Sequence, residues 1–139
     1  MDNSQESLFD KAMKRYESGV EAAELIKDFE AITQSAPGQS AGWTCLAWLQ
    51  LLCNENNNAL QSARIAVKLN SQDPQARINL SLALLETNSK GVRDHIEFVR
   101  RALFVIPDLE AEIKKSIEDG LERRSDWKSL KKVKDWLGF

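Results

Sequence analysis

The sequence is poor in the residues from which most metal and catalytic sites are built. Its 139 residues contain one histidine and two cysteines. His95 stands beside Asp94 and Glu97, but one histidine with two carboxylates near a turn is a poor ligand set for a metal. Cys45 and Cys53 share one predicted helix, about 12 Å apart along its axis, which is too far for a disulfide. We therefore expect no enzyme, no metal and no cofactor.

Long apolar runs and an excess of one charge are missing as well, and the chain has only three prolines and six glycines. No run approaches the ~18 apolar residues that cross a bilayer, and the acidic, polar amino terminus differs from a signal peptide. The six glycines are scattered, which argues against a phosphate-binding loop. A net charge of −2 gives no general attraction to nucleic acid. We expect one cytoplasmic domain that spans residues 1–139.

Apolar residues recur at helical spacing along the chain and never alternate over a useful length. This pattern predicts an all-α fold of about eight helices. We expect the first helix at Ser4–Glu17, and a capping box of Ser18 and Glu21 should start the second. Ser40 is the expected cap of the third helix, and the Asp73-Pro74 pair should open the fifth. The last helix should begin near residues 125–126.

The predicted helices also repeat. Residues 43–47 fall in register with residues 77–81, which lie 34 positions further along. A period of this length, carried by helices, is typical of stacked helix–turn–helix units. The matching residues are Trp43, Leu46 and Ala47 in the first segment and Arg77, Leu80 and Ser81 in the second.

At these residues the chain resembles the tetratricopeptide repeat (TPR) family, whose unit has 34 residues. The middle unit, 40–73, departs from the family pattern at Gln50, Ala63 and Ser71, where Tyr, Phe and Pro are usual. The resemblance implies a right-handed superhelical stack of antiparallel helix pairs. Its units would cover about 6–39, 40–73 and 74–109, with an irregular turn at 88–93 and capping helices at 109–138.

The resemblance also implies a concave groove that binds another protein. An apolar groove with a polar edge suits a partner helix or an extended peptide, as in an adaptor or assembly factor. Trp48 would be the anchor, so we expect Trp48→Ala to weaken binding and leave the fold intact. The alternative, that the chain's own N- or C-terminal helix fills the groove, stays open. The groove residues would be Thr44, Trp48, Leu51, Leu52, Gln75, Ile78, Asn79, Leu82, Leu85 and Glu86.

One subclass of the family holds the C-terminal carboxylate of chaperone tails with Lys and Asn side chains. Here Asn79 matches that pattern, and Lys115 stands where Arg is expected. Thr44, Trp48 and Ala111 replace the Lys, Asn and Lys that the rest of the pattern requires. The sequence therefore predicts that this clamp is absent.

The basic carboxyl-terminal region is the rival site. Residues 123–134 carry six basic side chains against Asp126 alone. They could contact the phosphates of a nucleic acid or another acidic surface, or they could simply keep the end of the stack solvated. We expect a protein partner first and nucleic acid second, and the oligomeric state stays open. The residues of this candidate contact site are Arg123, Arg124, Lys128, Lys131, Lys132 and the aromatic Trp136.

Overall fold

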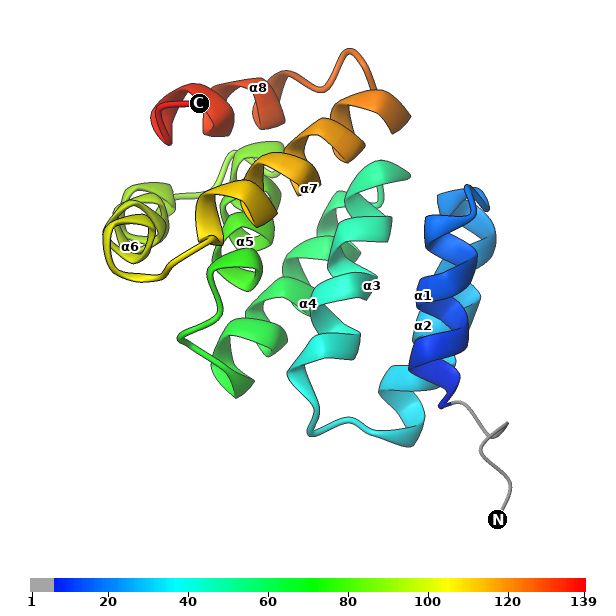
Figure 1. The fold of residues 1–139 in the computed structure, drawn as a ribbon. Helices are drawn as coiled ribbons and strands as arrows, with labels where there is room; N and C mark the ends of the chain where they lie inside the picture. The colour runs from blue at the N-terminus through cyan, green and yellow to red at the C-terminus, as the bar shows by residue number, and fades with distance from the viewer. Residues whose placement is uncertain (1–6) are drawn as a thin grey trace.

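The computed structural model describes residues 7–139, and all regular structure in that range is helical (Figure 1). The predicted starts of the first helix at Ser4 and of the first repeat at residue 6 lie outside the described residues. The helices are α1 (Leu8–Glu17), α2 (Ala22–Ser35), α3 (Ser40–Leu52), α4 (Asn56–Leu69), α5 (Pro74–Glu86), α6 (Val92–Val105), α7 (Leu109–Arg123) and α8 (Lys128–Trp136).

Local sequence chemistry explains several of these boundaries. Asp73 accepts a hydrogen bond from the Gln75 amide at 3.0 Å, and Pro74 occupies the first turn of α5 as predicted. The irregular turn before α6 is also confirmed. It contains Asn88 at φ +53° and Gly91 at φ +106°, a left-handed conformation that glycine adopts without strain.

Two predicted caps are wrong. Ser18 does not cap α2, because its hydroxyl donates to the Arg15 carbonyl at the end of α1. Glu21 is the residue that precedes α2, and its side chain makes no capping hydrogen bond. Ser40 is the first residue of α3 and follows an uncapped Gln39. The last helix was predicted to begin near residues 125–126. It begins at Lys128 instead, because residues 124–127 form the turn between α7 and α8.

The first six helices form a stack of three helix pairs, α1–α2, α3–α4 and α5–α6. Helices α3, α4 and α5 pack closely because small residues lie between them. Ala47, Ala59, Ala63 and Ala66 have no exposed surface. Helix α4 therefore lies close to both of its neighbours.

The last two helices do not continue this stack. In Figure 1, α7 runs from the α6 side across the stack toward α1, and α8 turns back above it. Trp127 before α8 is fully buried, and its ring lies 5.3 Å from that of Trp48 on α3. Ile113 and Ile117 of α7 belong to the same apolar core as Trp48. Helices α7 and α8 are thus parts of the core that close one side of the stack.

Candidate functional site

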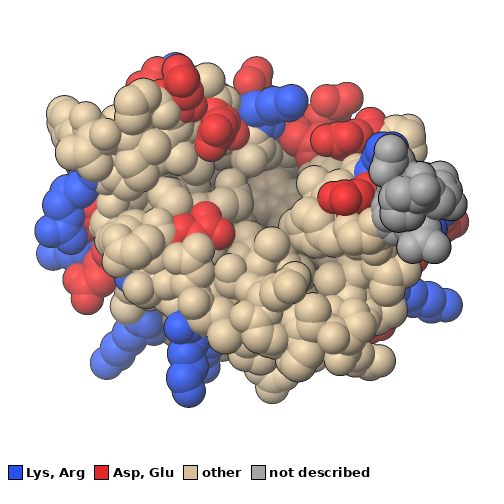
Figure 2. Space-filling model, turned by 60° about the horizontal axis from the view of Figure 1, so that its bottom comes forward, with Lys and Arg blue, Asp and Glu red and all other residues tan. Residues whose placement is uncertain are grey.

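An open cleft of about 1170 Å³ lies on the concave side of the stack, between α1–α2 on one side and α7 on the other. Figure 2 shows this face hollowed near its centre, with uncharged residues on the walls and acidic side chains along the upper edge. The volume exceeds the ~300–1,000 Å³ typical of small-molecule sites. It suits a larger ligand, such as a segment of polypeptide.

The walls of the cleft differ in character. The floor and the α1–α2 side are largely apolar, whereas α7 contributes a polar face. The apolar lining is Met13, Ala22, Ala23, Phe29, Cys45, Trp48, Leu49, Leu52 and Cys53. The polar lining from α7 is Lys115, Ser116, Asp119, Glu122 and Arg123.

A polar network holds α7 against α1 at one end of the cleft. The Tyr16 hydroxyl accepts a hydrogen bond from Trp48 Nε1 at 2.9 Å and donates one to Asp119 Oδ2. Burial raises the pKa of Tyr16 above its ordinary value, and the hydrogen bond to Asp119 raises it further. The hydroxyl therefore keeps its proton and connects three helices.

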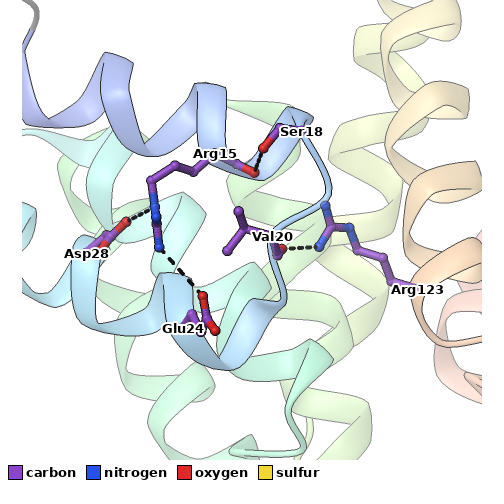
Figure 3. Close-up of polar contacts among 6 residues, drawn as sticks. All are labelled: Arg15, Ser18, Val20, Glu24, Asp28 and Arg123. Atoms are coloured by element: carbon purple, nitrogen blue, oxygen red, sulfur yellow. Dashed lines mark hydrogen bonds and ion pairs between the residues drawn. The ribbon is translucent and has the colours of Figure 1, made fainter.

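Arg123 completes this network. Its guanidinium lies 4.0 Å from the centre of the Tyr16 ring and 3.4 Å from Asp119 Oδ2. It also donates to the carbonyls of Tyr16 at 2.7 Å and Val20 at 3.1 Å. Figure 3 shows the Val20 contact beside Arg15, which joins α1 to α2 through Asp28. Arg123 thus satisfies carbonyls at the carboxyl end of α1, where a cation is favourable.

Arg124 has the same role at the end of α3. It donates to the Leu51 carbonyl at 2.9 Å, and its guanidinium lies 5.0 Å from the centre of the Trp127 ring. Both Arg123 and Arg124 have side chains that are only 19% exposed. The two arginines predicted as part of a basic contact surface are therefore internal capping groups.

The rest of the predicted basic site remains on the surface. Lys128, Lys131 and Lys132 are exposed, and Trp136 is 42% exposed at the edge of α8. The hypothesis of a basic contact site now rests on these four residues instead of six.

Half of the predicted groove residues do not line the cleft, because the chain itself covers them. Leu51, Ile78 and Leu82 are at most 1% exposed and pack in one core with α7 and α8. Glu86 accepts a hydrogen bond from Trp127 Nε1 at 2.9 Å, and Leu85 packs against the same core. The alternative that a terminal helix fills the groove therefore holds for this part of the concave surface.

Trp48 has a different role from the one predicted. It is 8% exposed, because Trp127 covers its ring and Gly120 of α7 lies directly against it. A Cβ atom at residue 120 would lie 2.8 Å from the Trp48 ring. Trp48 is a core residue with one edge in the cleft, so Trp48→Ala would disturb the fold as well as the cleft.

Four other predicted residues, Thr44, Leu52, Gln75 and Asn79, do line the open cleft. Asn79 is fully buried, donates to the Thr44 carbonyl at 2.9 Å and accepts from Gln75 Nε2 at 2.9 Å. Its oxygen and one of its two N–H groups are therefore engaged within the protein. The absence of the chaperone-tail clamp stays a prediction.

The two thiols in the cleft are poorly suited to nucleophilic chemistry. Burial raises the pKa of Cys45 to about 12, and burial followed by the charge of Glu55 raises the pKa of Cys53. Both are free cysteines and keep their protons at neutral pH. Among residues 7–139, no three His, Cys, Asp or Glu side chains are grouped to hold a metal. In the same range no helix is long and apolar enough to cross a membrane.

The groove predicted from the sequence lacks the cleft residues of α1 and α7. Its residues came from the second and third repeat units only, so Met13, Tyr16 and Glu17 were not among them. Asp119 and Glu122 were missed because residues 109–138 were expected only to cap the stack. Tyr16 offered one signal, since it occupies the position at which the family prefers tyrosine.

Comparison with known proteins agrees with this architecture. The translocator chaperone SycD of type III secretion in Yersinia enterocolitica superposes with a TM-score of 0.65 at 14% identity, over 95% of this chain and 92% of that one. The first TPR domain of Spaghetti (RPAP3), solved with the HSP90 peptide SRMEEVD, gives 0.54 at 18% identity, over 95% and 91%. The fold is thus that of an all-α TPR-like solenoid. No protein-family model matches the sequence, and no curated protein does.

Proposed function

We propose that this chain is a non-catalytic protein-interaction module that binds a segment of a partner protein in the open cleft. The observation that carries the proposal is the cleft itself, which has an apolar floor and walls held in place by the Tyr16 network. Such a preformed site binds with little ordering cost to the protein. An adaptor or an assembly factor would use it to hold one partner while other surfaces remain free.

The two structural neighbours support this proposal. One is titled a translocator chaperone, and the other is a TPR domain solved with a peptide. Both are interaction proteins that share the fold with this chain. The part of the concave surface that α7 and α8 leave open is the region in which we place the partner. This region comprises the side of α3 that faces α1, together with the polar face of α7.

A matched pair of substitutions in α2 tests the proposal. Ala23 and Ala31 are both exposed, but only Ala23 lines the cleft. We expect Ala23→Trp to obstruct the cleft and Ala31→Trp to leave it open, with little effect of either on stability. The probe is a random 12-residue peptide display library selected on the wild-type protein. Affinities of the selected peptides are then measured by fluorescence polarisation.

The expected result is that Ala23→Trp weakens the selected peptides by tenfold or more, whereas Ala31→Trp binds them as the wild type does. Equal binding by all three proteins would place the interaction elsewhere and contradict the proposal. A selection that enriches no peptide would also count against it. Circular dichroism and thermal melting of both variants confirm that the fold is retained.

A further inference from the structure

Three carboxylates without partners lie at one end of the cleft. Glu17 is the last residue of α1, Glu21 precedes α2, and Glu122 lies on α7. All three are exposed, and none makes a hydrogen bond or an ion pair within residues 7–139. They come from three segments that the fold brings to one opening, so their negative fields add.

Some other acidic side chains on the surface have cationic partners. Asp28 pairs with Arg15 at 2.9 Å, and Glu110 pairs with Lys114 at 2.9 Å. At the cleft, the nearest arginine is Arg123, and it is already engaged with Asp119 and two backbone carbonyls. The carboxylate end of the cleft is therefore locally uncompensated.

The cleft is also polarised along α7. Lys115 lines it as well, two helical turns from Glu122, which corresponds to about 10 Å along the axis. The apolar floor at the acidic end includes Leu52, the last residue of α3, and Cys53, which follows it. A ligand with an apolar group and a cationic group next to it would complement this end on both counts.

We propose that the cleft recognises a partner segment in which a lysine or an arginine adjoins an apolar anchor residue. The inference rests on the proposed function and specifies its partner. The apolar anchor lies over Leu52 and Cys53, and the cationic group lies between Glu17 and Glu122. Each ion pair at an exposed site is weak by itself, but three carboxylates act on the same cation.

Two other segments that could occupy the cleft complement its acidic end less well. The chain's first six residues carry Asp2 and Glu6 and no lysine or arginine, so their side chains repeat the charge of the cleft. A second copy of this chain could offer residues 104–106, whose large apolar side chains are exposed, with Phe104 at 91%. Over residues 100–110 that segment has two basic and two acidic side chains, so it has no excess of positive charge.

The test uses the selected peptides and two double variants with the same change in net charge. Glu17→Lys/Glu122→Lys reverses two carboxylates of the cleft. Glu112→Lys/Glu118→Lys reverses two exposed carboxylates of α7 that do not line it. We expect the selected peptides to be rich in lysine or arginine beside an apolar residue. We expect the first variant to lose about tenfold in affinity and the second to lose less than twofold.

Salt gives an independent measurement. The affinity of the wild type should fall severalfold between 50 and 200 mM salt, and the affinity of Glu17→Lys/Glu122→Lys should change little. If Ala23→Trp blocks binding but the selected peptides are neutral or acidic, this inference is overturned and the proposed function stands. Peptides that Ala23→Trp does not block would overturn both.

Two further outcomes would also overturn the inference, because they identify a different occupant. One is a concentration-dependent dimer, seen by light scattering, that Ala23→Trp abolishes. The other is a large gain in peptide affinity on deletion of residues 1–6, with no preference for basic peptides. Equal losses in the two double variants would show that net charge, and not the cleft, decides binding.

Discussion

The two ends of the concave surface are built from similar helices but held in different ways. At the α5 end, α7 and α8 cover the stack with apolar side chains, and Trp127, Leu130 and Val133 are fully buried. At the α1 end, α7 meets α1 through polar groups, chiefly Tyr16 and Arg123. Apolar packing closes the groove at the first end. Polar contacts fix the distance between helices at the second end and leave the cleft open.

Different parts of one concave repeat surface can therefore have different roles. In this chain the same row of helices supplies both a core and an open site. The positions of α7 and α8 decide which part of the concave surface is buried in the core and which part stays open. Substitutions at Trp48, Arg123 and Gly120 separate the two modes of contact, because each one removes or crowds a different set of contacts.

Trp48 joins the two ends, so its removal should have the largest effect. We expect Trp48→Ala to lower the free energy of unfolding by about 3–5 kcal/mol, because it leaves a cavity beside Trp127 and removes the hydrogen bond to Tyr16. Urea denaturation measures this loss. Trp43→Ala, at a half-buried position on the same helix, is the control and should cost clearly less. Equal losses would show that Trp48 is not the link between the ends.

Arg123 tests the polar end alone. We expect Arg123→Ala to destabilise the protein by about 1–3 kcal/mol, since two carbonyls and Asp119 lose a charged partner. Hydrogen exchange should become faster in α1 and α2 and remain unchanged in α5 and α8. Arg100→Ala, at a side chain that is 55% exposed, should change stability by less than about 0.5 kcal/mol. Faster exchange throughout the chain would contradict the separation of the two ends.

Gly120 tests the apolar end, where α7 crosses α3. A Cβ atom there would lie 2.7 Å from Leu130 Cδ2 and 2.8 Å from the Trp48 ring. We expect Gly120→Ala to cost about 1 kcal/mol net, because crowding of ~1–3 kcal/mol outweighs the gain of ~1 kcal/mol in helix propensity. Gly38→Ala, which meets no atom within 4 Å, is the control. A more stable Gly120→Ala protein would show that α7 has room to shift.

The smallest expected effect concerns pH. Burial and the nearby Arg77 lower the pKa of His95 below its ordinary value of 6.5. Below that pH the unfolded chain binds a proton more readily than the folded one, so stability should fall as the pH drops from 7 to 5. Thermal melting of the wild type and His95→Gln measures this. The variant should show a weaker dependence over this range, and an identical profile would contradict the assignment to His95.

Much of the helical architecture was predictable because it depends on local chemistry. The apolar period of the helices, the Asp73-Pro74 start and the turn at 88–93 each follow from a few adjacent residues. The caps proposed for Ser18 and Ser40 were wrong, because a serine near a helix boundary can bond to the helix before it or lie inside the next one. The groove was predicted only in part. Its lining depends on which helices lie opposite α3, and no local pattern specifies that.

The sequence by itself determined that this is an all-α chain with a 34-residue repeat, since helix period and turn chemistry are properties of neighbouring residues. The tertiary structure alone decided where the groove is closed and where it is open. Arg123 and Arg124 show the reason. In the sequence they look like surface charges, but in the fold they meet the carbonyl ends of α1 and α3, more than 70 residues away in the chain. Contacts over such distances depend on the packing of whole helices.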